Sequence, residues 1–293
     1  MKTHSRSNKT FQIFAYSFLL ILGVVLLYPL FYALIGSITT QIALDQSTKS
    51  IFPKIIDLFS NFDNYLVIFK TEGLGISILI SLARIVWRFS VITAVSVLVG
   101  FVFARMQFPF KNIIFLVLMS SMMIPGVAMT VPNYIFMSGL TMFGSDGLIN
   151  NPLIYFVVGL VDVYNIFLIR QSVSSLGGEM EEAAELDGAG LFRIVYCIYM
   201  PLLKPVVAVI FINLFAGVWA DYTTSFIYMA NNPDWHTIGY KVTEVMEYYT
   251  GRGERDYPKM YAVAIISILP PVIAFLCVQN SFIEGLSLGG VKG

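Results

Sequence analysis

The sequence contains few charged residues for its length. Lysine, arginine, aspartate and glutamate make up 12% of its 293 residues, whereas they make up about 25% of a typical soluble domain. Hydrophobic residues make up 57%, and the mean hydropathy is +0.77. The 18 basic and 18 acidic side chains cancel, so there is no electrostatic basis for binding nucleic acid. This composition predicts a polytopic membrane protein.

Cysteine and histidine are also scarce. Cys197 and Cys277 lie in apolar or semi-apolar sequence, and His4 and His236 are far apart, so no spacing typical of a zinc or haem site occurs. We therefore expect no metal site and interpret both cysteines as small buried hydrophobic residues. The phosphate-loop motif GxxxxGK(S/T) and the hydrolase motifs HExxH and GxSxG are missing too, so we expect neither catalytic residues nor a cofactor in this chain.

Six apolar stretches are long enough to cross a bilayer as helices, which takes about 20 residues. They cover residues 14–35, 76–103, 112–131, 152–169, 205–228 and 261–282. The segment 37–75 is too polar to cross. The first apolar stretch has no small-residue cleavage site, so we expect it to remain as a spanning helix. The sequence thus predicts an all-α integral membrane protein with six transmembrane helices.

Basic residues in the loops indicate the orientation. Lys2, Arg6 and Lys9 precede the first stretch, and Arg105 and Lys111 lie between the second and third, whereas 132–151 contains no basic residue. We therefore expect both termini to be cytoplasmic. The predicted organisation is a cytoplasmic tail (1–10), a first transmembrane helix with an extracytoplasmic segment (11–75), a transmembrane core (76–283) that includes a charged cytoplasmic loop (177–201), and a cytoplasmic C-terminal tail (284–293).

Prolines interrupt two of the apolar stretches. In the third, Pro125 follows Ser121 and removes an amide donor from the helix, which predicts a kink. Such a kink can line a polar pathway or serve only helix packing. In the sixth, Pro270 and Pro271 predict a bend near the middle.

Polar residues lie in the fourth stretch as well. Asp162 and Asn165 are three residues apart, which predicts that they share one helical face with Tyr155 and Gly159. An ionisable group at membrane depth normally faces a cavity or a partner. The pair is therefore either part of a transport pathway or a structural hydrogen-bonding pair between helices.

The second and fifth stretches add further polar side chains. Asn213, Gly217 and Asp221 recur every four residues and could line a pore, while Trp219 and Tyr222 could equally form an interfacial aromatic belt. On the second stretch, Arg84, Trp87 and Arg88 could contact a polar ligand or extend to lipid phosphates. The candidate pathway set comprises Ser121, Pro125, Asp162, Asn165, Asn213, Trp219, Asp221 and Tyr222.

The charged interruption at 179–190 is expected to begin with a short helix. Glu179, Glu181 and Glu182 fall in its first turn, where the helix dipole favours negative charge. Gly188 is a typical helix-ending residue. Asp187 lies in the last turn, where the dipole disfavours an anion, so another role must account for it.

This interruption resembles the EAA loop in permease subunits of binding-protein-dependent ABC importers. The matching pattern is Glu-Ala-Ala from Glu182, three residues, Gly188, nine residues, Ile198, one residue, Met200 and Pro201. Met200 stands where the family usually has leucine, and Gly177 stands where it commonly has proline.

The resemblance extends over about 76–293. Residues 219–222, Trp-Ala-Asp-Tyr, are similar to the family's Trp-Asn-Asp-Phe stretch, and 279–293 resembles the C-terminal signature of the carbohydrate subclass, which includes maltose permeases. The resemblance implies the type I ABC importer permease fold and the transport of a sugar or oligosaccharide. It also implies a bacterial or archaeal plasma or inner membrane.

The resemblance further implies partners and a contact with them. The partners would be a second homologous permease, two cytoplasmic ATPase subunits that bind ATP and magnesium, and an extracytoplasmic solute-binding protein. The loop would carry the coupling helix that docks on an ATPase. The residues implied in this coupling are Glu181, Glu182, Ala183, Ala184, Asp187, Gly188, Ile198, Pro201 and Lys292.

Other classes of function are less well supported. An ABC permease for a glycerol phosphodiester or a peptide would share most of these features. A secondary transporter could couple ions through Asp162, but the sequence shows no inverted pair of interrupted halves. A membrane-embedded enzyme would need a nucleophile, a base or metal ligands within the apolar stretches, and no such set can be assembled.

Overall fold

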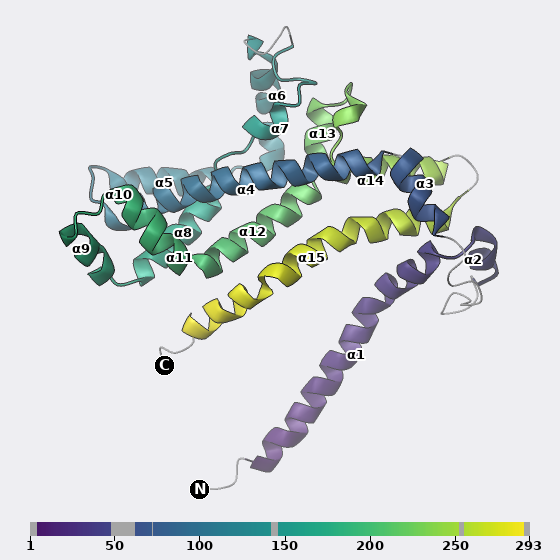
Figure 1. Ribbon diagram of the computed structural model, residues 1–293, viewed down its shortest axis with the longest axis horizontal. Coiled ribbons are helices and arrows are strands. Elements are labelled where there is room, and N and C mark those ends of the chain that lie inside the picture. Colours follow the sequence, from purple (N-terminus) through teal and green to yellow (C-terminus); the bar gives the residue numbers. More distant parts are fainter. Residues whose placement is uncertain (1–4, 48–61, 72, 142–145, 252–254, 290–293) are drawn as a thin grey trace. The chain divides into compact units, whose positions relative to one another are not determined.

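The computed structural model describes residues 5–47, 62–71, 73–141, 146–251 and 255–289, and within these ranges the secondary structure is helical, with no strand assigned (Figure 1). Side chains are described only as far as residue 280 at the C-terminal end. The chain divides into two compact units. One comprises 1–74 with 242–269, and the other comprises 75–241 with 270–293.

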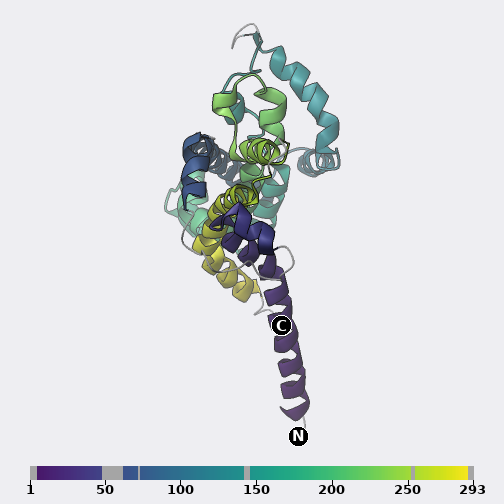
Figure 2. The ribbon, with the colours of Figure 1, turned by 90° about the vertical axis from the view of Figure 1, so that its right-hand side faces the viewer.

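The first unit contains α1 (Ser5–Ser37), α2 (Gln41–Ser47), α3 (Asp63–Thr71), most of α14 (Ile238–Gly251) and the first part of α15 (Tyr257–Gly289). The long α1 is visible in Figure 2 as one continuous helix. Near its end, a Cβ added to Gly36 would lie 2.6 Å from the Tyr261 ring, so only glycine permits this close approach. The Ser37 and Tyr65 hydroxyls are hydrogen-bonded at 2.6 Å, which ties α1 to α3.

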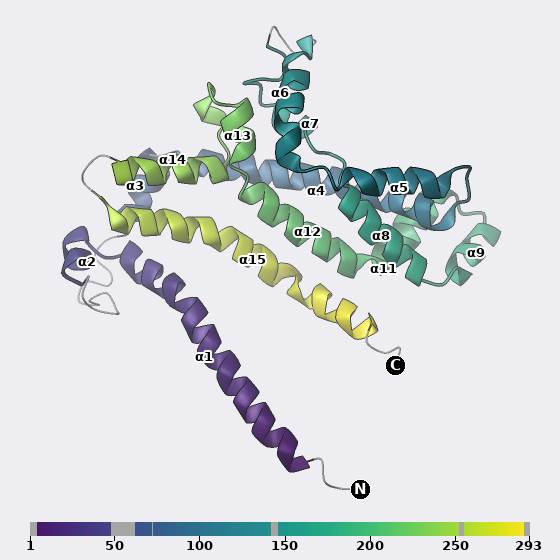
Figure 3. The same ribbon diagram turned by 180° about the vertical axis from the view of Figure 1, so that it is seen from behind.

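The second unit is built on α4 (Leu74–Arg105), α5 (Lys111–Ser121), α8 (Val163–Ser175) and α12 (Lys204–Trp219). Helix α8 packs against both α5 and α12, as the view from behind shows (Figure 3). Val97, Phe101, Ile169 and Ile210 belong to one buried apolar cluster. A Cβ on Gly100 would lie 2.6 Å from Ile169, so α4 and α8 approach closely at this point.

A smaller group of elements lies away from α9 (Glu179–Leu186) in the same unit (Figure 1). It contains the 3-10 turn η2 (Gly126–Met129), α6 (Thr130–Ser138), α7 (Ile154–Val157), α13 (Thr223–Tyr228) and the 3-10 turn η5 (Pro233–Trp235). Tyr155, Tyr228 and Met229 contribute to its buried core. The Tyr134 and Tyr228 rings stack with centroids 6.1 Å apart, which joins α6 to α13.

Three helices in the described part of the chain are long and apolar enough to span a membrane: Phe11–Ser37, Leu74–Arg105 and Tyr257–Asn280. They correspond to the first, second and sixth expected spans. Two bent pairs raise the number to as many as five: Lys111–Ser121 with Gly126–Ser138, bent by 90°, and Leu191–Leu202 with Lys204–Trp219, bent by 80°. Helix α15 continues without interruption through Pro270 and Pro271.

The break in the third expected span lies where the prolines predicted it. Helix α5 ends at Ser121, and Pro125 has an extended conformation (φ −60°, ψ 129°) before η2 begins. Because proline cannot donate to the helix ladder, the chain changes direction here instead of continuing as one helix.

The fourth expected span, 152–169, is not one continuous helix, so that prediction was wrong. Helix α7 ends at Val157, Gly159 has a left-handed conformation (φ 68°), and Asp162 is extended before α8 begins. Asp162 and Asn165 therefore do not share a helical face with Tyr155 and Gly159. Asp162 caps a new helix start with its side chain, and this cap competes with continuation of the previous helix.

The fifth expected span, 205–228, also ends earlier than predicted. Helix α12 stops at Trp219, and Ala220 is its C-terminal cap. Asp221 thus lies beyond the helix and does not extend a stripe with Asn213 and Gly217. Its side chain accepts a hydrogen bond from the Thr224 amide at 3.0 Å, which supports the start of α13 instead.

Candidate functional site

Helix α9 forms the charged interruption, with Glu179, Glu181 and Glu182 in its first turn, as the sequence predicted. Its end is fixed by Gly188, which has φ 78°. The Gly188 amide donates to the Glu185 carbonyl at 3.0 Å, and the Ala189 amide donates to the Ala184 carbonyl at 2.9 Å. These two bonds form a Schellman motif, which requires the left-handed residue.

An ion pair attaches α9 to the end of α4. The Arg105 guanidinium lies 3.2 Å from a Glu181 carboxylate oxygen, and the Tyr199 hydroxyl donates to the same oxygen at 3.0 Å. Arg105 also donates to the Leu176 carbonyl at 2.6 Å, just before α9. Glu181 is therefore an internal contact of this chain.

The other residues predicted to act in coupling divide into two groups by burial. Ala184 and Ile198 pack against the apolar cluster around Phe101. Exposed side chains or backbone are found at Glu182, Ala183, Asp187, Gly188 and Pro201. Lys292 lies outside the described residues.

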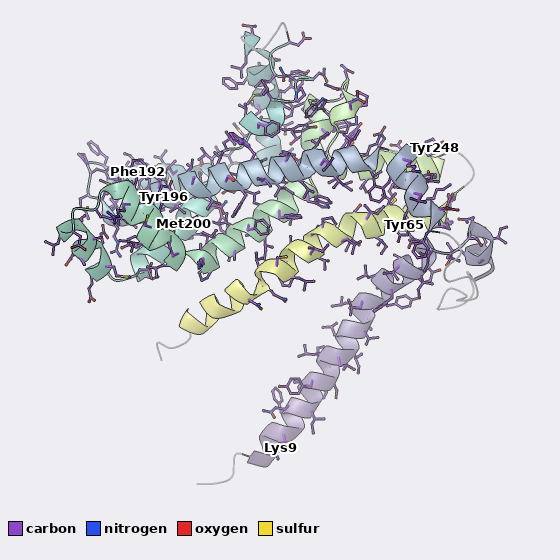
Figure 4. The ribbon with its side chains drawn as sticks, in the orientation of Figure 1. Lys9, Tyr65, Phe192, Tyr196, Met200 and Tyr248 are labelled. Carbon is purple, nitrogen blue, oxygen red and sulfur yellow. The ribbon has the colours of Figure 1, made fainter. Side chains whose placement is uncertain are left out.

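Apolar side chains extend the exposed surface of this loop, and the prediction did not include them. Leu186 at the end of α9 is 90% exposed. The next helical stretch runs through α10 (Leu191–Arg193), a π-helical segment (Ile194–Tyr199) and α11 (Met200–Leu202). Along it, Phe192 and Tyr196 are exposed and lie four residues apart (Figure 4). Met200 follows at the same interval but is half-buried and packs against the cluster around Phe101. Phe192 and Tyr196 stack with centroids 6.4 Å apart. The four-residue spacing of these large side chains in the sequence could have indicated that they lie along one side of a helix.

A polar recess of about 230 Å³ brings together residues from three of the expected spans. It unites Asp162 and Asn165 with Asn213, three of the predicted pathway residues. Arg88 of α4 also lines it. The described residues that line it are Arg88, Ile92, Asp162, Tyr164, Asn165, Asn213, Leu214, Gly217 and Val218.

The two charged side chains in the recess, Asp162 and Arg88, each form hydrogen bonds with the backbone. Asp162 Oδ1 accepts from the Tyr164 and Asn165 amides at 3.0 and 3.3 Å, so this carboxylate is the N-terminal cap of α8. Arg88 donates to the Gly159 carbonyl at 2.8 Å, while its buried Nε has no partner. Asn165 is only 3% exposed. Unpaired donors and buried amides in a recess favour a ligand or water that can hydrogen-bond to them.

The remaining pathway residues lie elsewhere. Ser121 and Pro125 are exposed around the break after α5. Trp219 is 5% exposed, and the Tyr222 ring stacks on Tyr240 at 5.1 Å. None of the four lines the recess.

Asp221 belongs to a separate buried network. It pairs with Arg84 at 2.6 Å, and Arg84 is 1% exposed. The Arg84 guanidinium lies 5.2 Å from the centroid of the Tyr155 ring, and the Tyr155 hydroxyl is hydrogen-bonded to Ser225 at 2.8 Å. Arg84 therefore does not extend to lipid phosphates, because Asp221 neutralises it inside the protein.

Trp87 and Arg88, which follow Arg84 on α4, donate hydrogen bonds to the broken fourth span. Trp87 donates to the Phe156 carbonyl at 2.8 Å, and Arg88 donates to Gly159. A broken helix leaves backbone carbonyls that need donors, and these two side chains supply them. The sequence gave no information on the partners of Trp87 and Arg88 in the fourth span.

Both cysteines are exposed, so the interpretation of Cys197 and Cys277 as buried residues was wrong. Cys197 lies in the loop at 177–201 and Cys277 lies in α15 (Tyr257–Gly289). Among the residues that the structure describes, no group of three or more histidine, cysteine, aspartate or glutamate side chains could hold a metal ion.

Comparison with known proteins defines the class. Residues 96–282 match the family described as "Binding-protein-dependent transport system inner membrane component", so the chain belongs to this family. It is a permease subunit of an ABC importer, and the predicted all-α permease fold is confirmed.

Relatives of this chain are similar over most of their length. The melibiose/raffinose/stachyose import permease protein MelC of Bacillus subtilis is 30% identical over 254 residues, covering 85% of this chain and 86% of MelC. The arabinooligosaccharides transport system permease protein AraQ of the same organism is 26% identical and covers 100% of both chains. A crystal structure of a bacterial ABC transporter that imports alginate contains a chain with TM-score 0.80 and 20% identity, covering 96% of this chain and 100% of that one. This last similarity concerns the fold alone.

Proposed function

We propose that this chain carries a sugar or oligosaccharide across the membrane after a solute-binding protein delivers it, with energy from ATP hydrolysis in separate subunits. The observation that supports this most directly is the loop at 177–201. It presents the exposed surface of α9 while Glu181 ties that helix to α4 through Arg105. The names of MelC and AraQ, transport permeases for melibiose, raffinose and stachyose and for arabinooligosaccharides, support the sugar class.

The partners in this proposal follow from the family. A second homologous permease completes the pathway, and two cytoplasmic ATPase subunits bind ATP and magnesium. The binding protein docks on the extracytoplasmic side, and both termini of this chain are cytoplasmic. The chain itself has no catalytic role in ATP hydrolysis.

The geometry supports a mechanical route from the ATPase to the pathway. A displacement of α9 acts directly on Arg105 because the ion pair and the Tyr199 bond share Glu181. Arg105 ends α4, and Arg88 on the same helix lines the recess. The two residues are about 25 Å apart at 1.5 Å per residue. One rigid helix thus connects the coupling loop to the recess.

The recess is the part of this chain that we assign to the substrate pathway. The recess offers both hydrogen-bond donors and hydrogen-bond acceptors, from the side chains of Arg88, Asp162, Asn165 and Asn213. The positive charge of Arg88 and the negative charge of Asp162 offset each other. Such a surface suits a neutral, hydroxyl-rich ligand better than an anion or an apolar molecule. A volume of about 230 Å³ limits the contact to a small part of an oligosaccharide.

Uptake measurements test this function. Cells with and without the chain are compared for uptake of labelled α-galactosides, arabino-oligosaccharides and a glycerol phosphodiester. We expect uptake of a sugar that requires the chain and stops when ATP is depleted. Chain-dependent uptake of the phosphodiester alone would contradict the sugar class, and uptake that survives ATP depletion but stops with the ion gradient would contradict the ABC mechanism.

A further inference from the structure

A second cavity, of about 530 Å³, lies where α4 ends and α5 begins. It is distinct from the recess and shares no residue with it. Among the described residues that line it, the charged ones are Lys111 and Arg170, both cationic, and none is acidic. The described residues that line it are Phe103, Ala104, Gln107, Phe108, Phe110, Lys111, Asn112, Ile113 and Arg170.

The two cations are held in place without an anionic partner. Lys111 donates to the Met106 carbonyl at 2.8 Å. Arg170 donates to the Phe103 carbonyl at 3.4 Å, and its guanidinium lies 3.9 Å from the centroid of the Phe115 ring. Neither forms an ion pair with any residue that the structure describes. Each retains further N–H donors, because lysine has three and arginine has five.

Neither the neighbouring Arg105 nor the dipole of α5 brings negative charge to this cavity. Arg105, the nearest basic residue along α4, is already neutralised by Glu181. Lys111 is the first residue of α5, where the helix dipole is itself positive. A lysine at this end of a helix is locally unfavourable, so helix stability does not account for it. The cavity therefore favours an anion with several acceptor oxygens.

Apolar side chains continue from the cavity along α5. Phe110 and Ile113 are 72% and 58% exposed, and α5 has no buried residue. Helix α5 belongs to a bent pair that is apolar enough to span a membrane. A ligand at this place would have its anionic group beside Lys111 and Arg170 and an apolar part along α5.

We propose that this cavity binds the phosphate group of an anionic membrane phospholipid. Lys111 and Arg170 bind the phosphate oxygens, and the acyl chains lie along the exposed face of α5. The structural alternative is that the two side chains only satisfy backbone carbonyls at the end of α4 and just after it, those of Phe103 and Met106. That role uses one N–H of each cation, whereas the proposal uses the others.

Lipid binding to the purified full-length transporter tests the proposal. The transporter is delipidated in a neutral detergent and titrated with phosphatidylglycerol, or with phosphatidylcholine of the same acyl chains, and bound lipid is counted by native mass spectrometry. Inorganic phosphate and glycerol 3-phosphate are titrated separately by calorimetry. The variants are Lys111→Gln with Arg170→Gln, the charge-conserving Lys111→Arg, and a control with Lys9→Gln and Lys204→Gln, which removes two exposed cations elsewhere.

We expect phosphatidylglycerol to bind more tightly than phosphatidylcholine. Loss of both cations weakens this binding about 25-fold, at about fivefold for each basic residue near an anionic headgroup. The control variant and Lys111→Arg retain it. Melting temperatures of all variants show whether each one is folded.

Two other outcomes are informative. If inorganic phosphate or glycerol 3-phosphate binds as tightly as phosphatidylglycerol, and the double variant loses this binding, the cavity is a phosphate site but its ligand is soluble. If the folded double variant binds phosphatidylglycerol as well as the parent does, the proposal is overturned and the carbonyl contacts explain both residues.

Discussion

At the residue scale, a few side chains have partners that make them far more sensitive to substitution than their position in an apolar sequence suggests. Arg84 is the main case. It is buried on α4 and neutralised by Asp221 from a segment 137 positions further along the chain, at 2.6 Å. Removing one member of a buried ion pair leaves an uncompensated charge, which costs more than the pair contributes.

We expect Arg84→Met alone, or Asp221→Leu alone, to lower the free energy of unfolding by about 3–5 kcal/mol. The combined Arg84→Met and Asp221→Leu variant should recover part of this loss, since the two residues are coupled. Thermal denaturation of the purified transporter measures both effects. Additive losses in the double variant would show that the pair is not coupled.

Gly188 is sensitive for a different reason. A Cβ at this position meets nothing within 4 Å, so the constraint is its φ of 78° and not space. We expect Gly188→Ala to destabilise the end of α9 by about 1 kcal/mol and Gly188→Asn by less, because asparagine tolerates the left-handed region.

Hydrogen exchange of residues 179–190 measures this effect. Gly177→Ala is the matched control, since Gly177 also has open space around it and its φ is not in the left-handed range. Equal exchange in Gly188→Ala and the parent would show that the Schellman motif does not fix this end.

At the element scale, Asp162 has two roles at the break in the fourth span. Its side chain caps α8, and it also lines the recess. Asparagine caps a helix about as well as aspartate, whereas alanine loses about 1 kcal/mol. Substitution by each therefore separates the cap from the charge.

We expect Asp162→Asn to leave the melting temperature unchanged and to reduce sugar uptake, because the carboxylate in the recess is lost. Asp162→Ala should lower both. Uptake assays together with thermal denaturation distinguish the two variants. Full uptake by the asparagine variant would mean that Asp162 serves only as the cap.

At the scale of the whole molecule, the coupling loop has an internal side and an exposed side. Glu181 and Ala184 face this chain, whereas Glu182 and Leu186 are exposed. The exposed side is the part that an ATPase subunit can contact. If α9 docks on an ATPase subunit as proposed, charge reversal at the exposed Glu182 changes that contact without disturbing the fold.

We expect Glu182→Lys to reduce recovery of the ATPase subunits with the purified permease at least tenfold, as for a lost charge-assisted hydrogen bond, while membrane insertion stays unchanged. Co-purification after detergent extraction measures this. Glu247→Lys on α14 carries the same charge reversal on another exposed residue and should retain the ATPase. Normal recovery with Glu182→Lys would contradict the role of α9 in docking.

Much of the architecture was predictable because it depends on local sequence properties. Apolar runs of sufficient length gave the first, second and sixth spans, and Pro125 gave the break after α5. The carboxylates in the first turn of α9 and Gly188 after it predicted this helix and its end, since dipole and left-handed backbone preferences act within a few residues. The Glu-Ala-Ala pattern then indicated the family that the comparison confirmed.

The continuity of the fourth span and the grouping of the polar residues depended on tertiary structure. Hydropathy cannot show that Trp87 and Arg88 supply donors to a broken helix more than sixty residues away, and without those donors the break would be too costly in a membrane. Likewise, the sequence alone identified Asp162, Asn165 and Asn213 as polar residues within apolar stretches. Only the packing of α4, α8 and α12 placed them in one recess and left Asp221 with Arg84, because contacts between distant segments form only when helices pack.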